Sequence, residues 1–180
     1  MGDFALLLRA LEFAARRHRD QRRRDRHASP FVNHPIEVAR LLADVGGVSD
    51  PHVLAAAALH DVVEDTETTL GDIELRFGRV VAALVGEVTD DPDLAGVERH
   101  RQQAERAPGL THGARLIKIG DKIANLREMP VEWSPSRRVE YATSARALVH
   151  ACRGTCLPLE QLFDAVAVAV SRDDGSSNPP

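Results

Sequence analysis

Histidine and acidic side chains interrupt an apolar stretch of this 180-residue chain, at His60, Asp61, Glu64 and Asp65. Between residues 53 and 63 the sequence reads VLAAAALHDVV, so positions 60 and 61 are the polar ones in a helix expected to be buried. Neighbours on a helix lie ~100° apart and residues four apart share a face, so the four side chains can form one polar face. Because an unpaired ionised carboxylate is costly to bury, such a group is paired, protonated or bound to metal. A divalent cation would resolve the conflict.

Two positions elsewhere in the chain could complete a metal site. His34 precedes Pro35 at the start of a predicted helix, and Asp121 lies among small residues in the helical stretch RLIKIGDKIANL. The predicted ligands then come from three helices and are His34, His60, Asp61 and Asp121. Two imidazoles and two carboxylates suit Mn, Fe or Zn better than Ca or Mg. Such an ion lowers the pKa of bound water and polarises a phosphoryl oxygen, so the predicted chemistry is metal-dependent phosphate hydrolysis.

Each of these residues also has a simpler interpretation. Alone, His34 could merely mark the start of a helix, and Asp121 could be a surface residue between lysines. The metal interpretation depends on their combination with the carboxylates at helical spacing, Glu64 and Asp65. The other histidines have no such context and are expected at the surface, with His18 as a neighbour of the site.

A strongly basic segment, residues 16–27, reads RRHRDQRRRDRH and carries seven arginines and two aspartates. It leads directly into SPFVNHP, which contains His34. Guanidinium groups bind phosphates in a bidentate manner and stack on flat rings, so a basic segment beside a metal site favours a phosphorylated nucleotide as ligand. A solvated helix end and a nucleic-acid patch are the alternatives. Nucleic-acid binding is disfavoured because no other segment is basic and aromatic residues make up 4% of the chain.

The elements that must position these residues are helices. Apolar residues make up 43% of the chain, and aromatics are rare, so alanine, leucine and valine must fill the core. Asp50 with Pro51 indicates one helix start, and the Ser-Pro pair at Ser134 indicates another. The predicted helices span residues 4–19, 34–47, 49–65, 68–78, 79–90, 96–108, 111–130, 134–154 and 159–170, of which 79–90 could also be a strand and 96–108 is polar and expected to be exposed.

We therefore predict one compact all-α domain, residues 1–171, built as a bundle of about nine or ten helices. Residues 172–180, RDDGSSNPP, are expected to form a disordered polar tail.

The bulk properties exclude several other classes of protein. No run of about 18 apolar residues is present, so no membrane span is predicted, and the amino-terminal stretch lacks the basic region of a secretory signal. We expect a cytoplasmic protein. The single pair Cys152 and Cys156 predicts neither a disulfide framework nor a zinc ribbon.

Taken together, the motifs resemble a known family. In order along the chain they are HRDQRRRD, PFVNHPIEVARLL, AAALHDVVEDTETTL, RFGRVVAALVGEVTDD and KIGDKIANLREM. The series is similar to the HD-type hydrolase domain of the RelA/SpoT homologues, and most similar to the small alarmone hydrolases of the metazoan SpoT-homologue type. The resemblance covers essentially the whole chain except the tail.

The resemblance implies a compact helical fold with one Mn²⁺ ion. By position, the implied ligands are His34, His60, Asp61 and Asp121. Glu64 and Asp65 match the pair that positions or activates the attacking water. The substrate-binding residues implied in the same way are Arg23, which stacks on the purine, Arg24, which serves the phosphates or the electrostatics of the site, Asn125, which contacts the sugar, and Arg137 and Tyr141, which lie near the substrate.

The reaction implied by the resemblance is removal of the 3′-pyrophosphate of ppGpp or pppGpp, which gives GDP or GTP and pyrophosphate. The same chemistry on ppApp-type nucleotides or on the 2′-phosphate of NADPH remains an alternative, as does a degenerate domain that binds nucleotide and regulates a partner. Neither nucleic acid nor membrane is an expected partner, and an oligomer is compatible with the sequence. One departure concerns the phosphates: many relatives carry lysines after VTDD, whereas this chain reads DDPDLAGVERHR there.

Overall fold

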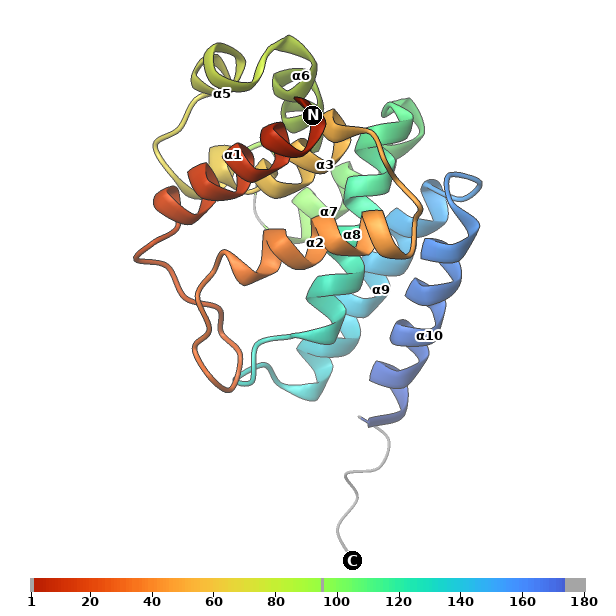
Figure 1. Cartoon of the computed structure of the whole chain (residues 1–180). Coiled ribbons are helices and arrows are strands. Elements are labelled where there is room, and N and C mark those ends of the chain that lie inside the picture. The colour runs from red at the N-terminus through yellow and green to blue at the C-terminus, as the bar shows by residue number, and fades with distance from the viewer. Residues whose placement is uncertain (1, 95, 174–180) are drawn as a thin grey trace, which may run out of the picture.

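The computed structural model describes residues 2–94 and 96–173. These residues form ten α-helices and one short 3₁₀ turn, and no strand, which confirms the predicted all-α class (Figure 1). The helices are α1 (Gly2–Arg17), α2 (Asn33–Asp44), α3 (Pro51–Leu59), α4 (Val62–Asp65), α5 (Leu70–Phe77), α6 (Arg79–Val88), α7 (Gly96–Arg106), α8 (His112–Arg127), α9 (Pro135–Ala151) and α10 (Leu157–Asp173), with the 3₁₀ turn η1 at Ala107–Gly109. Residues 79–90, for which a strand was the alternative, contain the helix α6.

Short polar side chains start the helices that matter most for the site. The Asp50 carboxylate accepts a hydrogen bond from the backbone N–H of His52 and begins α3, with proline next to it. Thr111 accepts from Ala114 N–H at the start of α8. The Ser134 side chain accepts from the backbone N–H of Arg137 at the start of α9. Each cap satisfies one of the N–H groups that a helix start leaves without a partner.

The helix predicted over 49–65 is interrupted at its centre, because α3 ends at Leu59 and α4 begins at Val62. The His60 ring hydrogen-bonds through Nδ1 to the carbonyl of Ala57 at 2.8 Å. That carbonyl is the one a continuous helix would offer to the N–H of Asp61, so the side chain competes with the helical bond. His60 and Asp61 therefore occupy a turn between two helices, not the middle of one.

Helix α3 is the buried centre of the bundle, and α1, α2, α6 and α8 pack around it. Residues 55–59, AAAAL, are fully buried. The small alanine side chains let the surrounding helices approach closely, which brings the polar turn that follows α3 next to α2 and α8. Gly120 adds to this, because a Cβ there would lie 2.5 Å from Leu42 Cδ1 on α2.

The carboxy-terminal helix α10 packs on α8 and α9. It runs to Asp173, two residues past the predicted end of the domain at 171. The rest of the predicted tail, residues 174–180, lies outside the described residues. Among the helices described, none has the length and apolar character needed to cross a membrane. Cys152 and Cys156 are both free thiols.

Candidate metal centre and adjoining cavity

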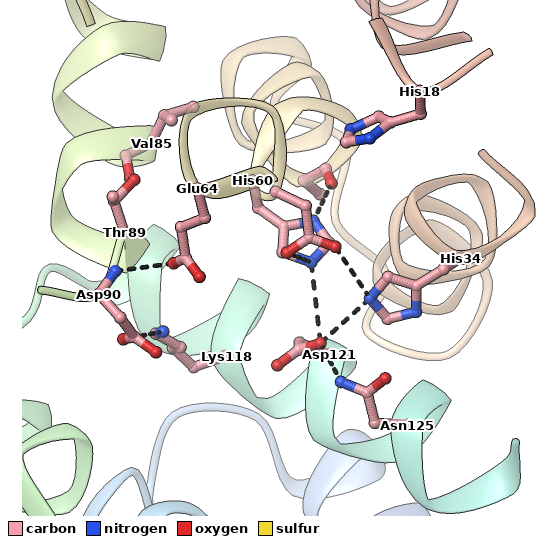
Figure 2. Close-up of polar contacts among 12 residues, drawn as sticks. His18, His34, His60, Glu64, Val85, Thr89, Asp90, Lys118, Asp121 and Asn125 are labelled. Carbon is pink, nitrogen blue, oxygen red and sulfur yellow. Dashed lines mark hydrogen bonds and ion pairs between the residues drawn. The ribbon is translucent and has the colours of Figure 1, made fainter. Parts of the chain in front are cut away.

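Side chains from α2, the turn after α3 and α8 converge on one buried point (Figure 2). The ligand atoms of His34, His60 and Asp121 all lie within 4.8 Å of one another. Asp121 Oδ1 is 3.2 Å from His34 Nε2 and 3.7 Å from His60 Nε2. The structure thus contains a buried His/His/Asp cluster of the kind that holds a metal ion.

Asp61, the fourth predicted ligand, adjoins this cluster. Its Oδ1 lies 3.1 Å from His60 Nε2, and its Oδ2 lies 3.5 Å from His34 Nε2. The carboxylate is partly exposed, whereas both imidazoles and Asp121 are buried. All four residues predicted as ligands are therefore brought together, with Asp61 on the solvent side.

The electrostatics of the cluster favour a positive charge at its centre. Burial lowers the pKa of His60, but the carboxylates of Asp61 and Asp121 override this and raise it to about 9. Burial raises the pKa of Asp121, yet Lys122 and the two imidazoles hold it well below its usual range. His34 and His60 both turn Nε2 toward the carboxylates, and within the described part of the chain the other ring nitrogen of His34, Nδ1, is buried without a hydrogen-bond partner. Two imidazole nitrogens and converging carboxylate oxygens form a donor set that fits a divalent transition metal.

Residues next to the cluster fix the orientation of Asp121. Lys122 Nζ donates to Asp121 Oδ2 at 3.0 Å, and Asn125 Nδ2 donates to Oδ1 at 2.6 Å. Lys118 and Lys122 are both buried, so the interpretation of Asp121 as a surface residue among lysines is wrong. Spacings of three and four residues place Asp121, Lys118 and Lys122 along one side of α8, and this spacing was the signal in the sequence for their proximity.

Glu64 and Asp65 lie beside the cluster at the end of α4. Glu64 Oε1 accepts from the backbone N–H of Asp90 at 2.7 Å, and Lys118 Nζ donates to Asp90 Oδ1 at 3.1 Å. Both residues are exposed to solvent, although neighbouring protein partly desolvates their carboxylates. Desolvation and the charge of Asp90 raise the pKa of Glu64 to about 7. Desolvation and the charge of Asp61 raise that of Asp65 to about 6.

His18, expected as a neighbour of the site, is buried and stacks on Phe31 with ring centroids 4.6 Å apart. Its Nδ1 lies 2.6 Å from Gln21 Oε1, and Gln21 Nε2 donates to the carbonyl of Asp65 at 2.7 Å. The Gln21 amide therefore accepts from His18 through its oxygen, and it links this histidine to the end of α4 at Asp65.

A cavity of about 470 Å³ opens beside the cluster, and Asp65 forms part of its wall. Four residues predicted to bind substrate line it, namely Arg23, Arg24, Asn125 and Tyr141. Arg23 Nη2 donates to Asn125 Oδ1 at 3.2 Å, and Asn125 in turn donates to Asp121. This chain of hydrogen bonds links the wall of the cavity to the metal cluster.

Arg137, the fifth residue predicted to bind substrate, is not part of the cavity lining but stacks on Trp133. The Arg137 guanidinium carbon lies 4.7 Å above the centre of the Trp133 ring, and Trp133 lines the cavity. Arg99 also lines it. Neither Trp133 nor Arg99 was predicted as a site residue. Trp133 follows a proline turn that carries no motif, and Arg99 belongs to the polar stretch expected to be exposed.

A larger cavity, of about 810 Å³, lies elsewhere in the molecule. Its lining includes Val53, Leu84 and Leu116, and none of the residues predicted for metal, catalysis or substrate. Size alone would favour it as the binding site. The convergence of buried histidines, perturbed carboxylates and arginines favours the smaller cavity instead.

Comparison with known proteins identifies the family of this chain. A family model described as "HD domain" matches residues 10–149. A mouse protein named guanosine-3′,5′-bis(diphosphate) 3′-pyrophosphohydrolase MESH1 is 50% identical over 171 residues, which cover 91% of this chain and 96% of the mouse protein. The human protein of the same name is 50% identical over 164 residues, 89% of this chain and 92% of its own length. A solved structure described as a metazoan orthologue of SpoT that hydrolyzes ppGpp matches with a TM-score of 0.88 and 42% identity, covering 92% of this chain and 95% of that one.

Proposed function

This chain belongs to the HD-domain family, in which it groups with the MESH1-type proteins, and we propose that it hydrolyses the 3′-pyrophosphate of ppGpp or pppGpp. Water adds across the bond between the 3′ oxygen and the adjacent phosphorus, so the products are GDP or GTP and pyrophosphate. The observation that carries the proposal is the continuity between the buried His/His/Asp cluster and a cavity lined by arginines. A metal cluster beside a cationic cavity of this size suits a small phosphorylated ligand.

The residues that would hold the metal are His34, His60, Asp61 and Asp121. We propose one Mn²⁺ ion, because the mixed nitrogen and oxygen donors suit that metal. When bound, such an ion lowers the pKa of water and polarises a phosphoryl oxygen. Lys122 and Asn125 hold the Asp121 carboxylate in place for it.

Glu64 is the proposed general base. A pKa of about 7 leaves a substantial fraction of the carboxylate ionised at neutral pH, while it keeps enough basicity to take a proton from water. The backbone N–H of Asp90 fixes one of its oxygens and leaves the other for the water. Asp65, on the cavity wall, orients the same water or the phosphate that it attacks.

The nucleotide would occupy the cavity. Arg23 presents a largely buried guanidinium, whose position is fixed by Asn125, and it can stack on a purine ring. Arg24 is more exposed and can reach phosphates from the rim. Asn125 would contact the sugar, with Tyr141 on the same wall and Arg137 behind Trp133.

Product analysis tests this function. The purified chain with Mn²⁺ is incubated separately with ppGpp, ppApp and NADPH, each with and without a chelator. We expect GDP and pyrophosphate from ppGpp, and no product once the metal is chelated. Turnover of ppApp or NADPH but not of ppGpp would support the metal-dependent hydrolysis and contradict ppGpp as the substrate. No turnover of any of the three by a metal-loaded protein would contradict the hydrolase function and favour a nucleotide-binding regulatory domain.

A further inference from the structure

Arg99 lies on α7, in the wall of the cavity that Asp65 also lines. Its Nη2 donates to the carbonyl of Leu94 at 3.0 Å, which braces the guanidinium against the turn before α7. Its Nε–H is buried and meets no acceptor among the described residues. Among the described residues, the Nη nitrogens of Arg99 make one hydrogen bond, to the Leu94 carbonyl, so other N–H groups of the guanidinium remain for a ligand in the cavity.

Neighbouring lysines already have carboxylate partners. Lys118 donates to Asp90 at 3.1 Å, and Lys122 donates to Asp121 at 3.0 Å. Arg99 is instead held by a backbone carbonyl, which does not neutralise its charge. Its positive charge is therefore directed at whatever fills the cavity.

Arg99 faces the end of the cavity where the chemistry would occur. It is one of the groups whose positive charge acts on Asp65. Asp65 lies one helical turn from Asp61 of the metal cluster. The basic residues Arg23 and Arg24 line the same cavity from the segment before α2, so the guanidinium groups approach a ligand from two separate segments of the chain.

We propose that Arg99 binds the diphosphate that is cleaved from the substrate and that leaves as pyrophosphate. The inference rests on the proposed function for the identity of that leaving group. A diphosphate offers several oxygens to a fork of N–H donors, and the Nη donors of Arg99 that the Leu94 carbonyl does not occupy can engage it in a bidentate manner. Residues 90–98 of this chain read DDPDLAGVE and contain no lysine, so Arg99 supplies the positive charge on this side of the cavity.

Calorimetric titration of inorganic pyrophosphate into the Mn²⁺-loaded chain tests whether Arg99 binds the diphosphate, and it needs no turnover. Arg99→Gln should weaken pyrophosphate binding about tenfold or more, because charge-assisted hydrogen bonds are lost. It should leave the affinity for GDP within about twofold of the parent, because the other product uses the arginines before α2. A circular-dichroism melt verifies that the variant is folded.

Arg101→Gln is the matched control. Arg101 lies on the same helix, is exposed, and pairs with Glu98 and Glu105. This variant removes the same charge from α7 and should bind pyrophosphate like the parent. Equal losses in both variants would mean that only the net charge of α7 matters, and would overturn the proposal.

Two other outcomes would overturn it. One is a folded Arg99→Gln protein that binds pyrophosphate as the parent does. The other is a loss of GDP affinity with pyrophosphate affinity retained, because that would place Arg99 on the nucleoside side. Failure of the proposed function gives a different result. A chain that binds pyrophosphate through Arg99 but does not hydrolyse ppGpp would support the pyrophosphate site and contradict the proposed reaction.

Discussion

Lys122 Nζ donates to Asp121 Oδ2 at 3.0 Å, and these adjacent residues of α8 are both buried. Burial lowers the pKa of Lys122, but the Asp121 carboxylate overrides this and raises it above its usual range, so the pair is ionised. The ammonium group and the Asn125 amide hold the carboxylate between them, and the same carboxylate faces His34 and His60. Asp121 is therefore oriented for a cation before any cation binds.

Replacing Lys122 should weaken metal binding. In Lys122→Met the Asp121 carboxylate loses the partner of one oxygen, and we expect Mn²⁺ affinity to fall about tenfold in calorimetric titration. Lys118→Met is the matched control, because Lys118 donates to Asp90 and not to Asp121, and it should bind Mn²⁺ like the parent. Equal Mn²⁺ affinity in the Lys122 variant and the parent would contradict the orienting role.

The pKa of Glu64 predicts the acidic limb of the pH profile. If the ionised carboxylate is the base, kcat should rise with pH through an apparent pKa of about 7, because desolvation and the charge of Asp90 raise the pKa of this group. Asp90→Asn removes the repelling charge, so the limb should shift to lower pH. Steady-state kinetics between pH 5 and about 9 measure both. If the apparent pKa of the acidic limb is unchanged in Asp90→Asn, a group other than Glu64 controls that limb.

The same raised pKa has a consequence for stability. Folded Glu64 holds its proton to about pH 7, whereas the ordinary value for the unfolded chain is 4.5, so the folded state binds more protons between these limits. The contribution of this group to the free energy of unfolding therefore decreases as pH rises through that window. Denaturant unfolding of the parent and of Glu64→Gln should show a pH-dependent difference between about 4.5 and 7 that flattens outside it. A difference independent of pH would contradict the raised pKa.

Removal of the metal should destabilise the fold. The ligands come from α2, the turn after α3 and α8, so a bound ion joins elements that lie far apart in the sequence. At a free ion concentration of about 100 times Kd, binding adds about 2.7 kcal/mol to the free energy of unfolding, and a chelator should lower Tm accordingly. His34→Ala should abolish this chelator effect, and the exposed His112→Ala should preserve it. An identical chelator-induced shift in His34→Ala would remove His34 from the site.

The predicted ligands could be recognised in the sequence because their residue types conflict with apolar surroundings. His60 and Asp61 follow a run of buried alanines, and this conflict is visible without any knowledge of the fold. The break between α3 and α4 could not be predicted in the same way, because it depends on the bond between His60 and the Ala57 carbonyl. Apolar periodicity predicts helix across such a turn.

The role of α7 depends on long-range packing. In its sequence, GVERHRQQAER, the apolar residues besides glycine are Val97 and Ala104, and Val97 is 72% exposed, so the apolar positions do not mark the face that lines the cavity. In the structure Gln103 donates to Asp90, and Arg99 lines the cavity, whereas Arg101 pairs with glutamates at the surface. The docking of α7 on α9 selects these directions, and that contact joins segments that are distant in sequence. No residue of α7 is buried, which agrees with the expected exposed segment, but Arg99 and Gln103 are only partly exposed.

Arg23 offers a test of how the nucleotide is held. Its guanidinium is nearly buried and donates to Asn125, so Arg23→Ala should remove both a stacking surface and a support of the cavity wall. We expect KM for ppGpp to rise about tenfold with a smaller change in kcat, because Arg23 reaches the metal cluster only through Asn125. Arg26→Ala, an exposed neighbour on the same segment, should leave both constants unchanged. If kcat falls while KM stays constant, Arg23 acts on the transition state, and another part of the cavity must hold the purine ring.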